Sequence, residues 1–570
     1  MPGLPVWTRL CPVDVTRHPV LAGAAELLAA PETRAALHEG QRAGTYPAEV
    51  VAQLRRLGVA RLFTSEAEVF HLCGLNAIAA AVDGSLAITL GVNALALLPV
   101  HLGAAPELRR RVFQKIDDGA FAAMLLTELD HGSNLLRNEA SATPHPDGGY
   151  RLGGEKHLIN GATRHDVLVA LMRTARGGAV AFGDFSVFCV DRDDSVEALP
   201  RWSTLPARAA DIAGVRFHGT HVPEDSLVGK LGDGFSLVQR TLTLSRGGIS
   251  GLASGCASGA LALAREYART RDVYGAPIVG LDAIADHLVA HAELDLVVAA
   301  MAVKAAVAAN ALGIGAAIYT AAAKLACCAL AEEAVEQGRR VVSSRALLAE
   351  QPYERFVRDV TLYGVFDGTS HLMLTDLSLR LPQIVKVRDD VEPTLPRVAA
   401  MFAAPPRPLA ALGDARAPVR HFDLSAHARA LDAVDGGVAF TAFVALADAV
   451  TVLGRGLRGL KAWNDQGVRF ALAEALAWLE CAFALVELAD PPRRAAVGAP
   501  ALPEGQAVSR DILAGALAGL GLRARARLLA VAAAADLPVP ADMSQVERDL
   551  VAVRAAARPG ARAWVRSPLS

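Results

Sequence analysis

Apolar and polar positions follow a helical period over the first 121 residues of the chain. Apolar residues recur at spacings of three and four, and glycines stand near the ends of the runs. The clearest examples are the segments 21–30, 47–59 and 106–119. The N-terminal part is therefore predicted to be a helical domain, residues 1–121.

The pattern changes near residue 122. Short segments rich in β-branched and aromatic residues follow, separated by Gly, Asp and Pro, which is typical of strands. They are 147–161, 166–175, 186–193 and 213–222. A β-domain is predicted over 122–235, and helical periodicity returns over 236–390.

Prolines mark the next change in texture. Six fall within 391–418 (Pro393, Pro396, Pro405, Pro406, Pro408 and Pro418), so 391–423 is predicted to be a linker. Beyond it, 424–570 is helical again, with a Pro/Gly-rich break at 491–505. The expected fold is mainly α, with an inserted β-domain and an additional helical domain at the end.

Composition narrows the functional classes. The chain has 570 residues, 52% of them hydrophobic and 20% charged, which suits a globular protein of several domains. The 57 basic residues nearly balance the 59 acidic ones, so no overall charge points to nucleic acid or to a membrane. The N-terminus lacks the pattern of a signal peptide, and the scattered cysteines lack zinc-site spacing. A reducing cytoplasm is therefore expected.

Two segments could be mistaken for something else. The apolar stretch 294–331 is long enough to suggest a membrane span, but Lys304 and Lys324 interrupt it, which favours buried bundle helices. The glycines 251, 255 and 259 recur every fourth residue rather than in a dinucleotide-binding pattern. They predict a helix face packed very closely on a neighbouring helix or on a surface that carries a cofactor.

Four motifs in order resemble signatures of the acyl-CoA dehydrogenase family. The first is LLTELDHGSN (125–134), in which Gly132 and Ser133 turn the backbone after a strand. The others are DGGYRLGGEKHLINGATRHDVLVAL (147–171), SRGGISGLASGCASGALALAREYARTRDVYGAPI (245–278) and QPYERFVRDVTLYGVFDGTSHLML (351–374). The resemblance covers about residues 45–385.

This resemblance implies an N-terminal helical bundle, a middle β-barrel and a C-terminal four-helix bundle, with FAD between the last two. Cofactor contacts carried over by position are Leu126, Thr127, Gly132, Ser133, Leu158, Asn160, Arg271, Tyr274, Thr369 and His371. Arg271 and Tyr274 would reach the FAD of the neighbouring subunit. Substrate contacts would come from Ser133, Arg246 and Gly368.

Asp367 stands where the family has its catalytic Glu. The α-proton of an acyl thioester is weakly acidic, and a carboxylate in a dry pocket can remove it while flavin N5 takes the β-hydride. Asp is shorter than Glu by one methylene, roughly 1.5 Å, and a misplacement of about 1 Å can cost roughly a hundredfold in rate. The alternative base position in the family corresponds to Ser245, which cannot serve as a base.

Other departures concern the cofactor. Arg340, Ser343 and Ser344 replace a Gln and two Gly that normally receive the partner's FAD. Leu158 and Asn160 replace the usual Trp and Thr beside the flavin.

His287 and His291 have the spacing of one helix face, but with no third ligand in view no metal is predicted.

The resemblance implies FAD-dependent α,β-dehydrogenation of an acyl thioester of coenzyme A or acyl carrier protein. Electrons would pass to an electron-transfer flavoprotein or another acceptor. Two alternatives stay open: a flavin monooxygenase or oxidase on the same fold, and a non-catalytic assembly subunit.

The region 424–570 resembles the extension of the very-long-chain enzymes, which implies a homodimer. Its segment 440–463 is apolar over much of its surface and must be covered. We expect the rest of its own domain to cover this segment. A membrane surface contacted by Arg455, Arg458 and Lys461 is the alternative, and a carrier-protein contact is a third.

Overall fold

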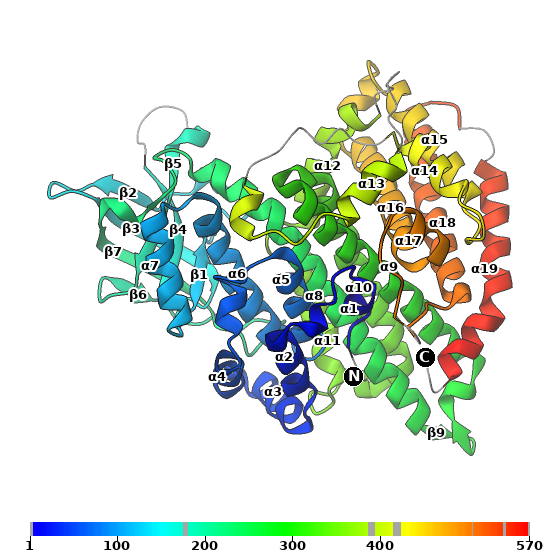
Figure 1. Cartoon of the computed structure of the whole chain (residues 1–570), viewed down its shortest axis with the longest axis horizontal. Coiled ribbons are helices and arrows are strands. Elements are labelled where there is room, and N and C mark those ends of the chain that lie inside the picture. Colours follow the sequence, from blue (N-terminus) through cyan, green and yellow to red (C-terminus); the bar gives the residue numbers. More distant parts are fainter. Residues whose placement is uncertain are drawn as a thin grey trace.

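The computed structural model describes residues 4–174, 181–385, 394–413, 423–503, 506–539 and 543–567. The β-domain lies at one end of the molecule and the C-terminal helices at the other, with the helical bundle between them (Figure 1). The expected fold class is confirmed. In chain order, the protein consists of N-terminal helices, an inserted sheet, a helical bundle and further helices.

The N-terminal region consists of helices that begin and end at the residue types expected from the sequence. Pro occupies the first turn of α2, α3 and α7, where its missing N–H costs nothing. Asp83 caps α6 by accepting from the Leu86 N–H at 2.8 Å. The helices are α1 Val6–Leu10, α2 Pro19–Ala29, α3 Pro31–Ala43, α4 Ala48–Arg56, α5 Val69–Ala80, α6 Gly84–Gly103 and α7 Pro106–Asp117.

The β-domain is an eight-stranded sheet, ordered β6-β7-β3-β2-β4-β5-β8, with β1 beside β4. Its strands are β1 Ala122–Leu125, β2 Ser141–Pro144, β3 Tyr150–Asn160, β4 Val167–Arg173, β5 Phe185–Asp191, β6 Val196–Ala198, β7 Ile212–Val222 and β8 Leu227–Val228. Alternate residues of β4 enter two different cores. Val167, Val169 and Leu171 join the main helical core, and the intervening residues join the core of the sheet. This strand therefore fixes the sheet against the helices.

The bundle consists of α8 Gly234–Thr270, α9 Asp282–Leu312, α10 Ala317–Val342, α11 Tyr353–Tyr363 and α12 Ser370–Ile384. The predicted glycine face of α8 packs on α5. A Cβ at Gly255 or Gly259 would overlap the carbonyl oxygen of Ala77 or Ala81, so only glycine permits this approach. The prediction of close helix packing is confirmed.

In the part of the chain that the structure describes, three helical stretches are long and apolar enough to cross a membrane by length and composition: 84–103, 234–270 and 282–347. Between 72% and 83% of each apolar window is buried inside the protein. The prediction that 294–331 forms buried bundle helices is therefore confirmed. Cys327 and Cys328 are likewise buried, with their thiols directed to the carbonyls of Val298 and Tyr363.

The interpretation of 391–423 as a linker needs correction. The segment contains the helix α13 Thr394–Phe402 and a short 3-10 turn, Leu409–Leu412. Val398, Met401 and Phe402 are buried in the main core, so the prolines did not prevent packing. The parts of the predicted linker at 391–393 and 414–422 lie outside the described residues.

The C-terminal helices are α14 Leu424–Asp432, α15 Thr441–Gly456, α16 Gln466–Ala489, α17 Pro491–Ala496, α18 Arg510–Ala534 and α19 Met543–Arg566. The apolar face of α15, which includes Phe443, Leu446 and Val450, is buried against α14, α16 and α18. The expected cover by its own domain is confirmed. We refer to 424–567 as the extension.

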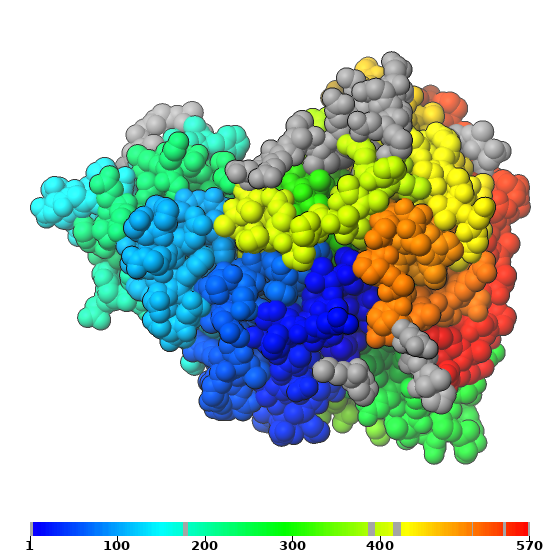
Figure 2. Space-filling model, viewed as in Figure 1, coloured from blue at the N-terminus to red at the C-terminus, as the bar shows by residue number. Residues whose placement is uncertain are grey.

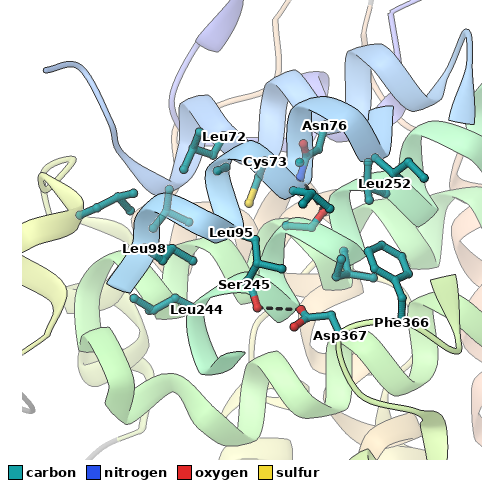
Figure 3. A pocket seen from close by; sticks show the side chains of 18 residues that line it. Leu72, Cys73, Asn76, Leu95, Leu98, Leu244, Ser245, Leu252, Phe366 and Asp367 are labelled. Carbon is teal, nitrogen blue, oxygen red and sulfur yellow. Dashed lines mark hydrogen bonds between the residues drawn. The ribbon is translucent and has the colours of Figure 1, made fainter. Parts of the chain in front are cut away.

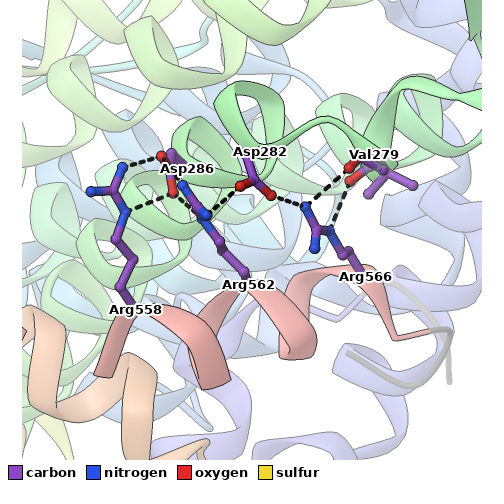
Figure 4. Close-up of polar contacts among 7 residues, drawn as sticks. Val279, Asp282, Asp286, Arg558, Arg562 and Arg566 are labelled. Carbon is purple, nitrogen blue, oxygen red and sulfur yellow. Dashed lines mark hydrogen bonds and ion pairs between the residues drawn. The ribbon is translucent and has the colours of Figure 1, made fainter. Parts of the chain in front are cut away.

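Charged pairs attach the extension to α9. Arg558, Arg562 and Arg566 of α19 form a row opposite Asp282 and Asp286 (Figure 4). The bonds from Arg562 and Arg558 lower the pKa of Asp286. Because these groups are partly exposed to solvent, which screens their charges, each pair contributes little to stability.

A second charged group is fully buried between α9 and the extension. Glu487 of α16 pairs with Lys304 of α9 and accepts from His427 of α14 at 2.9 Å. Burial alone would raise the pKa of Glu487, but Lys304 and His427 hold it below its ordinary value. The carboxylate is thus charged and holds three helices together.

We expect Glu487→Gln to destabilise the protein by about 3–5 kcal/mol, because Lys304 would remain buried without its counter-charge. The matched control is Asp448→Asn, which breaks the exposed pair with Arg429 and should cost about 1 kcal/mol or less. Urea unfolding of both variants measures the difference. Equal losses would contradict this account.

Candidate active site

Asp367 lies in the loop between α11 and α12. Its φ is +54°, in the left-handed region that Asp tolerates better than most residues, and Gly368 follows at φ +94°. Lys324, buried in α10, donates to the carbonyl oxygens of Phe366 (2.5 Å) and Gly368. The lysine thus holds the peptide on both sides of Asp367.

One carboxylate oxygen of Asp367 accepts a hydrogen bond, and the other has no hydrogen-bond donor among the described residues. The Ser245 hydroxyl of α8 donates to Oδ2 at 2.6 Å (Figure 3). Oδ1 is buried, and no described residue provides it with a hydrogen bond. Burial raises the pKa of Asp367, an effect opposed by the charge of Lys324, the Ser245 hydrogen bond and the charge of Arg246.

An apolar pocket opens beside this carboxylate. It lies between α5, α6 and α8, with Phe366 and Asp367 on one side (Figure 3). Its walls are mainly aliphatic: Val69, Leu72, Ile88, Val92, Ala94, Leu95, Leu98, Leu244, Ile249, Leu252 and Leu409. The remaining wall residues are Cys73, Asn76, Gly91, Ser245 and Gly248. The arrangement places a proton acceptor at the edge of a dry, hydrocarbon-lined cavity.

A buried ion pair shapes the segment after β1. Lys156 of β3, which is fully buried, donates to Glu128 Oε1 at 2.9 Å and to the Leu126 carbonyl at 3.3 Å. Glu128 also accepts the backbone N–H groups of residues 139 and 140. The pair therefore orders Leu126 and Thr127 against β3. Sequence reasoning did not assign this role, although both residues lie within the motifs at 125–134 and 147–171.

Strand β3 is irregular at Leu158. Its register with β7 shifts between Lys156 and Ile159, and Leu158 adopts a φ of +57° with half of its surface exposed. Such bulges redirect side chains, and a strained backbone is often found at functional sites. Two residues on, Asn160 is 6% exposed, and no described residue pairs with either polar atom of its amide. Leu126 and Thr127, which follow β1, thus lie against β3, the strand that carries Leu158 and Asn160.

The other predicted contacts are more dispersed. Gly132 and Ser133 are exposed in the loop after β1, and neither lines the apolar pocket. Thr369 caps α12 by accepting from the Leu372 N–H, and His371 is exposed one residue into that helix. Arg246 follows Ser245 on α8 but is bound to Asp376 at 2.7 Å and does not line the pocket.

The residues predicted to meet a partner subunit lie on the surface of the single chain. Arg271 ends α8 and is exposed, and Tyr274 is 95% exposed with a φ of +57°. Ser343 is also exposed and has a φ of +61°, a conformation that favours glycine. Ser343 thus occupies a backbone conformation that glycine adopts more readily.

The histidine pair has other partners. His287 Nδ1 bonds Gln337 Oε1 at 2.8 Å, and His291 Nε2 bonds the Ala257 carbonyl at 3.0 Å. Across the described part of the chain, no group of three His, Cys, Asp or Glu side chains is placed to hold a metal ion.

Comparison with known families agrees with this geometry. Residues 123–220 match the acyl-CoA dehydrogenase middle domain, and residues 232–381 match the acyl-CoA dehydrogenase C-terminal domain. The segment with Leu126, Thr127, Leu158 and Asn160 falls in the first match. Ser245, Lys324 and Asp367 fall in the second.

Relatives and solved structures include several dehydrogenases. A probable acyl-CoA dehydrogenase of Mycobacterium tuberculosis, FadE10, is 30% identical over 287 residues, 48% of this chain and 44% of the relative. The very long-chain specific acyl-CoA dehydrogenase of Mus musculus is 25% identical, over 59% of this chain and 51% of the relative. The chain thus spans about half the length of the curated relatives it matches.

Among solved structures, an acyl-CoA dehydrogenase of Bacillus anthracis complexed with FAD has a TM-score of 0.71 at 16% identity. The alignment covers 96% of this chain and 94% of that one, so the extension belongs to the shared fold. Butyryl-CoA dehydrogenase of Megasphaera elsdenii has a TM-score of 0.60 and covers 64% of this chain and 97% of its own. Residues 123–220 and 232–381 thus match the two acyl-CoA dehydrogenase domains, and the arrangement of helices around them is shared with solved acyl-CoA dehydrogenases.

Proposed function

We propose that the protein is an FAD-dependent dehydrogenase that introduces an α,β double bond into an acyl thioester. The observation that carries the proposal is Asp367, whose carboxylate is held by Ser245 at the edge of the apolar pocket with Oδ1 vacant. A buried carboxylate with a raised pKa is suited to accept a proton from a weakly acidic carbon.

In the proposed reaction, Asp367 Oδ1 takes the α-proton of the thioester. The electron pair of that C–H bond becomes the second bond between Cα and Cβ as the β-hydrogen leaves as hydride. FAD, when bound, supplies the acceptor for this hydride. The hydrocarbon walls exclude water, which keeps the carboxylate poorly solvated and therefore more basic than in water.

The conformation of the loop at Asp367 bears on the shorter length of Asp compared with Glu. A carboxylate one methylene short must be brought forward by its backbone. The left-handed conformation at Asp367, fixed by Lys324 on the flanking carbonyls, supplies such an adjustment. We propose that Lys324 is a positioning residue for the base.

The β-domain offers groups that suit a flavin. The isoalloxazine presents an apolar ring face and an edge of alternating donors and acceptors. An exposed leucine at a strained bulge, Leu158, and the unpaired amide of Asn160 match these two requirements. Leu126 and Thr127, ordered by the Lys156–Glu128 pair, complete this candidate flavin surface.

We propose further that the working assembly is a cytoplasmic homodimer. Arg271 and Tyr274 are free in the single chain to contact the cofactor of a second copy. The substrate carrier is coenzyme A or acyl carrier protein, and the electrons leave to an electron-transfer flavoprotein or a similar acceptor.

Asp367→Asn tests the base. The amide keeps the shape of the side chain but cannot take a proton, so anaerobic bleaching of bound FAD by acyl thioester should slow by at least about a hundredfold. Asp448→Asn, on the surface of the extension, is the control and should bleach normally. Undiminished bleaching in Asp367→Asn would remove this residue from the mechanism and favour an oxidase or monooxygenase. A wild-type protein that binds no FAD would favour an assembly role.

Ser245→Ala tests whether the Ser245 hydroxyl tunes the pKa of Asp367. Its hydroxyl stabilises the charged form of Asp367, so its loss raises the pKa of that carboxyl. The base must be deprotonated, so the rate increases as pH rises through this pKa, and the acidic limb should move to higher pH by roughly one unit. Ser245→Thr keeps the hydroxyl and should restore the profile. An unshifted limb in Ser245→Ala would show that the bond has no role in tuning the base.

Arg271→Ala tests the dimer. If Arg271 pairs with the partner's cofactor phosphates, its removal should weaken FAD binding by about 10- to 100-fold while the chain stays folded. The ratio of absorbance at flavin and protein wavelengths gives the occupancy, and light scattering after size exclusion gives the mass. Arg458→Ala, exposed on the extension, is the control. Full occupancy in Arg271→Ala, or in a stable monomer, would be incompatible with this proposal.

A further inference from the structure

One wall of the apolar pocket comes from a segment C-terminal to the matched family domains. Leu409 lines the pocket, yet the match to the C-terminal domain ends at residue 381. Leu409 belongs to the stretch between α13 and the extension, residues 404–413, which we call the strap. In the space-filling view this yellow-green part of the chain lies directly on the blue N-terminal helices (Figure 2).

The N-terminal half of the strap is anchored to the end of α9. Asn310 donates from its amide to the carbonyls of Ala404 (3.3 Å) and Pro405 (3.0 Å), and its own amide oxygen accepts from the Arg407 N–H at 2.9 Å. The Arg407 guanidinium reaches the carbonyls of Asn310 and Ala311. A buried asparagine therefore fixes where the strap leaves α13.

The C-terminal half is anchored beside the pocket. The Leu409 N–H donates to the Ala67 carbonyl at 3.0 Å, next to a bridge between Pro408 and Glu68. Arg240 of α8 donates to the Gly413 carbonyl at 2.9 Å. The strap thus contacts the segment leading into α5 and the helix α8, both of which also form pocket walls.

A glycine marks the path of the strap. The carbonyl oxygen of Leu412 lies so close to Gly313 that a Cβ there would overlap it, and Gly313 has a φ of +57°. Leu409 and Leu412 are only 2% and 0% exposed. The course of the strap is therefore determined by packing on both of its faces.

The chemistry of the wall restricts the ligand. Among the described residues that line the pocket there is no Lys, Arg or His, and the one acidic side chain is Asp367. A substrate carboxylate would be buried there without a counter-charge and near a like charge, which is strongly unfavourable. An uncharged aliphatic acyl group has no such penalty.

We propose that Leu409 is a specificity-determining residue and that the strap completes the pocket for an uncharged aliphatic acyl group whose size Leu409 limits. This inference rests on the proposed dehydrogenase function. It adds that a segment beyond the family's two matched domains helps to select the substrate.

The test compares full-length holoenzymes carrying Leu409→Ala, Leu409→Phe or the control Leu412→Ala, which is equally buried in the strap but does not line the pocket. The substrates are butyryl-, octanoyl- and glutaryl-CoA. Leu409→Ala should raise the octanoyl-to-butyryl ratio of kcat/KM by about tenfold or more, and Leu409→Phe should lower it. Leu412→Ala should change the ratio by less than about twofold.

Binding of non-reacting thioether analogues, measured by calorimetry, supplies a readout apart from turnover and should show the same ordering of chain lengths. Thermal unfolding monitors the fold, and Leu409→Val, which also shortens the side chain, replaces Leu409→Ala if the latter does not fold. An unchanged ratio in the Leu409 variants, or glutaryl-CoA as good a substrate as butyryl-CoA, would overturn this inference alone. If no thioester bleaches the wild-type flavin, the proposed function fails instead, and analogue binding still reports on Leu409.

Discussion

The close approach of α8 to α5 is the constraint on which the site depends. Gly251, Gly255 and Gly259 let the two backbones come into direct contact, and no larger residue fits at the last two positions. The same pair of helices forms opposite walls of the pocket, where the Asn76 amide donates to the Gly248 carbonyl at 3.1 Å. With α8 fixed in this way, Ser245 is carried to within hydrogen-bond distance of Asp367. The packing of one helix thus sets both the width of the pocket and the position of the carboxylate.

Lys324 shows how an apolar bundle can hold a strained loop. Its ammonium group is buried, which lowers its pKa, and it is surrounded by backbone carbonyls of the loop. A buried donor without partners would be costly, so the lysine and the loop stabilise each other. The left-handed backbone at Asp367 follows from this contact.

The extension is joined to the bundle by contacts of two kinds. The row of arginines on α19 opposite Asp282 and Asp286 is partly exposed to solvent, so it contributes more to alignment than to stability. The buried group of Lys304, Glu487 and His427 is different, because none of its charges can return to water without separating α9, α14 and α16.

Much of this protein is determined by its sequence. Periodicity and breakers located most of the helices, though not α13, and the four longest strands, because short-range patterns decide those elements. Four local motifs located Asp367, Leu158 and Asn160, because such motifs keep their spacing along the chain. The glycines at 251, 255 and 259 predicted a close helix contact but not which helix is the partner. Only the tertiary structure showed that the partner is α5. The same limit applies to Lys324 and Leu409. In the sequence, Lys324 is a charged residue that interrupts an apolar helix, and Leu409 is part of a proline-rich linker. Each acquires its role from residues far away in the chain. A charge within an apolar segment and a leucine among prolines have no local pattern that identifies a distant carbonyl or a pocket, so long-range packing alone decided what they do.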